Sequence, residues 1–99
     1  MSELRLSRTV VVNNPQGLHL RPIEQFAKLA GQFDAKIELV HDSVRADGKS
    51  ILHILTLGAA HGTNLVIEAA GPDAEKALDA LVKLVENDFE EESGQPQTD

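Results

Sequence analysis

Apolar residues recur along the chain with two spacings, and the alternation between them divides the sequence into seven elements. A period of two predicts strands over residues 4–12, around Ile37 and Leu39, around Val44, and over 65–69. Apolar positions three and four apart predict a helix over 22–30, a short one ending at Leu57, and a last one over about 72–88. The resulting order is βαββαβα.

Capping and turn residues separate these elements. Asp42-Ser43 and Asp47-Gly48 are typical of turns, Ser50 is a preferred N-cap for the short helix, and Pro72 favours the start of the last helix. The last helix has one apolar stripe, which needs a sheet face to cover. We expect these stripe residues in the core: Ala74, Ala77, Leu78, Leu81, Val85 and Phe89.

Composition fits a single domain with an aliphatic core, which we place at residues 1–90. The chain has 99 residues, 41% of them hydrophobic, with three Phe and no Trp or Tyr. It has no Cys, so disulfide and thiolate chemistry are excluded. The first residues resemble neither a signal peptide nor a membrane span, and we expect a cytoplasmic protein without membrane insertion.

The formal net charge of −7 lies mostly at one end of the chain. Residues 86–99 contain six acidic side chains and no basic one, which leaves ten acidic against nine basic residues before them, or −1. We expect residues 91–99 to form a solvated, disordered tail. The acidic balance and the scarcity of aromatic residues argue against nucleic acid as a partner.

The segment GLHLRP (residues 17–22) places candidate phosphate chemistry at one chain reversal. His19 would lie near the N-terminus of a helix, where unpaired amides carry partial positive charge. Gly17 permits a close backbone approach, and Arg21 supplies a guanidinium that suits phosphate. A neutral imidazole is a competent nucleophile. Read alone, however, His19 could also be an ordinary turn residue.

Residues 14–22 (NPQGLHLRP), 25–28 (QFAK) and 48–52 (GKSIL) together resemble HPr, the histidine-containing phosphocarrier of the bacterial sugar phosphotransferase system. The likeness runs over about residues 8–85. It implies an α+β fold, an open-faced β-sandwich with a four-stranded antiparallel sheet and three helices on one face. It also implies a monomeric carrier without cofactor, rather than a self-sufficient catalyst.

In this family, enzyme I transfers a phosphoryl group from phosphoenolpyruvate to the histidine matched by His19, and IIA components of sugar permeases remove it. The resemblance implies that His19 carries the group on Nδ1, with Arg21 beside it, and that Gly17, Leu20 and Arg21 bind the phosphate. It also implies partner docking through Leu20, Ile51, Leu52 and Leu55. The inward or outward phase of the last three is not fixed by spacing.

Ser50 matches a serine that a kinase phosphorylates in some relatives, where the modified protein binds a transcriptional regulator. The sequence leaves open whether Ser50 is regulatory or only a helix cap. An alternative function follows: a regulatory binding module, in carbon or nitrogen control, that acts through Ser50 with little role for His19. His19 itself favours the carrier.

Some positions depart from the family pattern. Leu20, Ile23 and Glu24 replace smaller residues near the histidine, which puts partner choice in question more than phosphorylation.

No pair of the four histidines has the spacing of a metal site, so we expect no bound metal.

Overall fold

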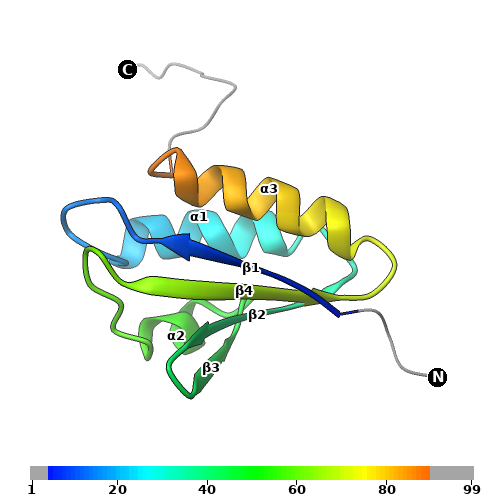
Figure 1. Cartoon of the computed structure of the whole chain (residues 1–99), viewed down its shortest axis with the longest axis horizontal. Helices are drawn as coiled ribbons and strands as arrows, with labels where there is room; N and C mark the ends of the chain where they lie inside the picture. The colour runs from blue at the N-terminus through cyan, green and yellow to red at the C-terminus, as the bar shows by residue number, and fades with distance from the viewer. Residues whose placement is uncertain (1–4, 90–99) are drawn as a thin grey trace.

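The computed structural model describes residues 5–89 and has the predicted order of elements (Figure 1). The predicted tail, 91–99, lies outside the described residues. The bounds are β1 Arg5–Val11, α1 Leu20–Ala30, β2 Lys36–His41, β3 Val44–Asp47, α2 Ile51–Leu55, β4 Asn64–Ala70 and α3 Ala74–Glu86.

The four strands form one antiparallel sheet in the order β1-β4-β2-β3. The last strand in the chain, β4, therefore lies in the middle, where Ile67 pairs with Arg8 on one side and with Leu39 on the other. Chain segments far apart in sequence are thus joined across the sheet (Figure 1). The predicted open-faced sandwich, with its helices on one face, is confirmed.

The core lies between this sheet and the helices, because alternate strand residues and one stripe of each long helix face inward. On β4, Leu65, Ile67 and Ala69 are at most 2% exposed, and Ile23 and Phe26 of α1 pack against the same layer. The six stripe residues predicted on the last helix are all buried. This burial of aliphatic side chains is the main source of stability in a domain of this size.

The helix ends differ from the predicted bounds by about two residues. Helix α1 begins at Leu20, before Pro22. A proline is tolerated in the first turn because the amides there have no acceptor within the helix. Helix α2 ends at Leu55, since the amides of Thr56 and Leu57 bond three residues back and tighten the last turn. Helix α3 begins at Ala74, after Pro72.

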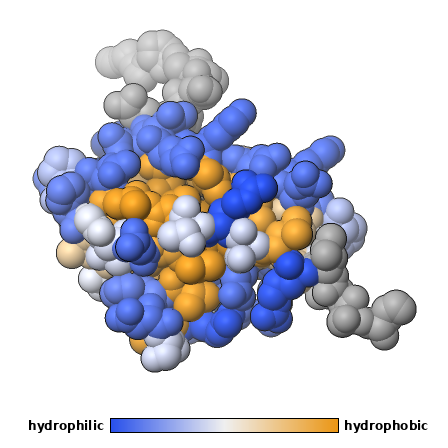
Figure 2. Space-filling model, viewed as in Figure 1, coloured by the Kyte–Doolittle hydropathy of each residue, from blue (hydrophilic) through white to orange (hydrophobic). Residues whose placement is uncertain are grey.

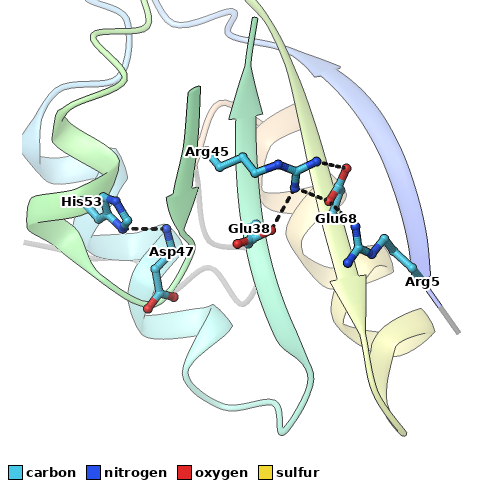
Figure 3. A network of polar contacts seen from close by, with 6 residues as sticks. All are labelled: Arg5, Glu38, Arg45, Asp47, His53 and Glu68. Carbon is cyan, nitrogen blue, oxygen red and sulfur yellow. Dashed lines mark hydrogen bonds and ion pairs between the residues drawn. The ribbon is translucent and has the colours of Figure 1, made fainter. Parts of the chain in front are cut away.

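The face of the sheet without helices carries a charge cluster that extends across all four strands (Figure 3). Glu38 of β2 lies directly opposite Glu68 of β4, and Arg45 of β3 bridges them with its Nη1 atom 2.9 Å and 2.7 Å from their Oε1 atoms. The hydrogen bond from Arg45 holds the pKa of the Glu68 carboxyl below its usual range, although partial burial opposes it. Arg5 lies 3.6 Å from Glu68 on the other side.

This network makes two adjacent carboxylates compatible, since like charges facing each other across strands would otherwise repel.

Figure 2 shows hydrophobic surface in the middle of the molecule, bordered by hydrophilic side chains. Within residues 5–89, no helix combines the length and apolar character needed to cross a membrane.

Candidate functional site

The connection between β1 and α1 is a tight turn built on Asn14 and Gly17. The Gly17 amide donates to the Asn14 carbonyl at 2.9 Å, and the Asn14 side-chain amide donates to the Gly17 carbonyl at 2.8 Å. Gly17 has a φ of +73°, as its predicted role requires. A Cβ atom there would lie only 2.8 Å from the carbonyl oxygen of Ala59, so the position admits only glycine without a backbone shift.

A second loop, residues 58–63, supports this turn. The Leu18 amide donates to the Ala59 carbonyl at 2.9 Å. Two more backbone bonds join Val12 to the loop, one to the Thr63 carbonyl at 2.9 Å and one from the Gly62 amide at 2.8 Å. The start of α1 is therefore held by segments more than 40 residues away in the sequence, which local pattern analysis does not detect.

His19 is the N-cap of α1, and its side chain is exposed. Its backbone is extended, with φ −97° and ψ −175°, and its carbonyl accepts the hydrogen bond from the Ile23 amide at 3.2 Å. The imidazole makes no capping hydrogen bond. The backbone of His19 thus starts the helix, while the ring stays accessible to a second molecule.

The first turn of α1 presents unused donors next to this ring. Among residues 5–89, the amides of Leu20 and Arg21 have no protein acceptor, and Pro22 has no amide proton. No acidic residue lies in the first turn. The N-terminus of the helix therefore offers two N–H groups and a partial positive charge to an anion placed beside His19.

The side chains that follow His19 divide between surface and core. Leu20 is 51% exposed, and Arg21 and Glu24 are also exposed. Arg21 forms no ion pair with any other described residue. Ile23 is fully buried, so this departure from the family pattern fills the core and does not alter the surface around His19. Leu20 and Glu24 are the departures that remain on the surface.

Ser50 is the N-cap of α2, as predicted, and its Oγ atom accepts a hydrogen bond from the His53 amide at 3.2 Å. The ring of His53 makes a second connection, because its Nδ1 atom accepts from the Asp47 amide at 3.0 Å (Figure 3). The Lys49 ammonium donates to the Phe33 carbonyl at 2.7 Å. Ser50 thus lies within a short, well-connected link between β3 and α2.

The phase of α2, which spacing left open, is settled by its burial. Ile54 is 1% exposed and Leu57 is 7% exposed, whereas Leu52 is 77% and Leu55 41% exposed. Ile51 is half-buried against the core. Helix α2 packs against α1, the helix that begins with Leu20. Three of the four residues predicted to dock partners are therefore exposed leucines on two adjacent helices.

Sequence reasoning missed two residues of this region, Asn14 and His53. Asn14 was noticed only as part of a motif, although an Asn followed by Pro at the start of a turn is a recognised signal for a side-chain bond to nearby backbone. The contact of His53 with Asp47 has no comparable signal, since it depends on how β3 meets α2.

Within residues 5–89, no three potential metal ligands lie together.

Comparison with known proteins agrees with this geometry. The family model described as "PTS HPr component phosphorylation site" matches residues 6–87. The phosphocarrier protein HPr of Treponema pallidum is 41% identical over 85 residues, covering 86% of this chain and 97% of that protein. The phosphocarrier protein NPr of Shewanella violacea is 38% identical, covering 90% of this chain and 98% of that protein.

Among solved structures, HPr from Thermoanaerobacter tengcongensis superposes with a TM-score of 0.83 at 37% identity, covering 88% of this chain and 98% of that one. The match therefore extends over sequence and three-dimensional fold together, and it includes the turn, His19 and the start of α1. The chain belongs to the HPr family of phosphocarrier proteins of the phosphotransferase system.

Proposed function

We propose that His19 is the residue on which this chain carries a phosphoryl group between two proteins. The observation that supports this most directly is the position of the ring. His19 is exposed at an N-cap, its imidazole is not used in capping, and the adjacent amides of Leu20 and Arg21 have no acceptor within residues 5–89. A phosphoryl dianion on the ring would be stabilised by those amides and by the helix terminus.

The transfer itself needs little from this protein. The lone pair of His19 Nδ1 attacks the phosphorus atom, a nitrogen–phosphorus bond forms, and the bond between phosphorus and the donor's nitrogen breaks, returning its electron pair to the donor. The reverse exchange on the next protein discharges the carrier. Arg21 binds phosphate oxygens with its guanidinium as charge moves onto the group, while Gly17 lets the backbone approach closely.

The exposed leucines supply a docking surface for both exchanges. Leu20, Leu52 and Leu55 lie on the adjacent helices α1 and α2, and large exposed apolar side chains of this kind mark protein contact sites. Ile51 contributes mainly to the support of this surface, since it is half-buried. We propose enzyme I as the donor, IIA components of sugar permeases as acceptors, and a cytoplasmic monomer as the working form.

A second function, regulation through Ser50, is favoured by the position of that residue. Ser50 begins the helix that carries Leu52 and Leu55, so a phosphate there would add nearly two negative charges at the docking surface. A serine kinase would then control partner choice, and a transcriptional regulator could bind the modified form. This function uses the same surface and does not need the His19 ring.

The test is incubation of the full chain with phosphoenolpyruvate and enzyme I, followed by phosphorus NMR. We expect an acid-labile phosphoramidate signal that disappears in His19→Ala and persists in His61→Ala, a matched control at another exposed histidine. Persistence of the signal in His19→Ala would place the phosphate elsewhere.

Absence of any signal in the folded wild-type protein would refute the carrier function. Incubation with ATP and a serine kinase, with Ser50→Ala as control, then tests the regulatory alternative directly. An acid-stable phosphate that depends on Ser50 would support regulation through this residue.

A further inference from the structure

The amide of Asn14 is held in one orientation by its contact with Gly17. Its Nδ2 atom donates to the Gly17 carbonyl at 2.8 Å, while its Oδ1 atom is buried and has no hydrogen-bond partner among the described residues. The reverse orientation would place Oδ1 against the Gly17 carbonyl, two acceptors facing each other, and would bury the amide protons. The contact with Gly17 therefore fixes the side chain.

That same carbonyl is the link to His19. The Gly17 oxygen also accepts a hydrogen bond from the His19 amide at 3.0 Å. The side chain of Asn14 and the amide of His19 thus share one acceptor, the Gly17 carbonyl. The Asn14 carbonyl meanwhile accepts from the Gly17 amide at 2.9 Å, so that Gly17 is bound to Asn14 at both its N–H and its C=O.

Stability alone does not explain this choice of residue. A buried carbonyl oxygen without a partner costs about 1–3 kcal/mol, and such groups are few in native proteins, where each calls for an explanation. The neighbouring Asn13 is exposed and makes no hydrogen bond with a described residue through its side chain. The Nδ2 bond to the Gly17 carbonyl is kept although the other end of the amide has no partner among the described residues.

We propose that Asn14 is a positioning residue for phosphoryl transfer: it orients the Gly17 carbonyl, and through it the backbone of His19 and the amides that follow. This inference rests on the function proposed for His19. Asn14 does not touch the phosphoryl group. Its effect is to hold the ring and the N-terminal amides of α1 in register, and small displacements of reacting groups reduce rates strongly.

The experiment compares Asn14→Ala and Asn14→Asp with Asn13→Ala and Asn13→Asp in the full chain. The initial rate of phosphoryl transfer from phosphorylated enzyme I is measured as a function of carrier concentration, and folding is checked by thermal denaturation. Asn14→Asp is almost isosteric and removes the Nδ2 donor, and Asn13→Asp adds the same charge one residue away.

We expect both Asn14 variants to lower kcat about tenfold or more. KM should change little, because the docking surface formed by Leu20, Leu52 and Leu55 is intact. Both Asn13 variants should stay near the wild-type rate. The carbonyl carbon shift of Gly17 and the amide shift of His19 should move in the Asn14 variants only.

The proposal would be overturned if the Asn14 variants lost no more activity than the Asn13 variants, or if only KM rose. It would equally be wrong if both Asn14 variants unfolded the protein, since Asn14 would then serve folding. Failure of the wild-type protein to accept phosphate would instead refute the function proposed for His19, and the two failures are thereby distinguished.

Discussion

At the scale of single residues, the site depends on backbone contacts that admit little variation. Gly17 combines a positive φ with a position directly against the backbone of Ala59 and Ala60. Gly58 also has a positive φ, +58°, but a Cβ atom added there would point into open space. Substitutions at these two glycines therefore differ in steric contact but share the backbone strain of a positive φ.

Gly17→Ala is expected to lower the free energy of unfolding by about 1–3 kcal/mol from strain, and by more because its Cβ atom would meet the Ala59 carbonyl at 2.8 Å. Gly58→Ala should show the strain alone. Urea denaturation of both variants measures the difference, and an equal loss in the two would show that the close contact has no energetic weight.

At the scale of elements, a side chain at the start of one helix joins that helix to another part of the chain. Asp73 is the N-cap of α3, but its carboxylate makes no capping bond. It instead accepts from the Asp34 amide at 2.9 Å and the Ala35 amide at 2.8 Å, joining α3 to the loop before β2. Chiefly the bond from Asp34 holds the pKa of the Asp73 carboxyl below its ordinary value.

Because the pKa of Asp73 is lower in the folded state than in the unfolded state, its ionised form stabilises the fold at neutral pH. This contribution is lost as the pH falls through the folded-state pKa. Asp73→Asn should therefore be less stable than wild type at pH 7, and the difference should shrink below about pH 4. Thermal denaturation across this range measures it, with Asp34→Asn as control.

Ser50 caps the start of α2 with its side-chain hydroxyl. Ser50→Ala removes the acceptor for the His53 amide and should cost about 1 kcal/mol of stability. Ser50→Asp keeps an acceptor at the helix start and should cost less. Ser43→Ala, in an exposed turn, is the matched control, and amide hydrogen exchange in α2 distinguishes local fraying from global unfolding. A loss in Ser50→Asp as large as in Ser50→Ala would contradict the capping role.

Hydrophobic periodicity predicted the type and order of the elements because each strand and helix has one buried face. It predicted the helix ends only to within about two residues, since the last turn depends on local backbone bonds such as those of the Thr56 and Leu57 amides in α2. The candidate site was predictable for His19 and Arg21, which one motif places together. The bond of Asn14 to nearby backbone has a sequence signal, the following Pro15, but its connection to His19 has none, because that connection runs through the backbone carbonyl of Gly17.

At the scale of the whole molecule, apolar residues are divided between a core and a surface, and α2 contains both kinds. Leu52 is 77% exposed and Ile54 is 1% exposed, although only one residue separates them. The core residue holds the short helix on the domain, and the exposed one is available to a partner.

Ile54→Ala should lower the free energy of unfolding by about 2–5 kcal/mol, as buried truncations do, whereas Leu52→Ala should change it by less than about 0.5 kcal/mol. In phosphoryl transfer, Leu52→Ala should raise KM for the carrier at nearly constant kcat. Chemical denaturation and steady-state kinetics test the two halves separately, and an unchanged KM would remove Leu52 from the docking surface.

The contact between Gln25 and Phe89 has a practical consequence for labelling. The Gln25 side chain donates to the Phe89 carbonyl at 2.8 Å, and Phe89 lines a small apolar cavity together with Leu18 and Ile23. The last described residue therefore lies beside the first turns of α1, whereas β1 begins at the far end of the sheet (Figure 1). An affinity tag or fluorophore is better joined before Arg5, where it leaves access to His19 unobstructed.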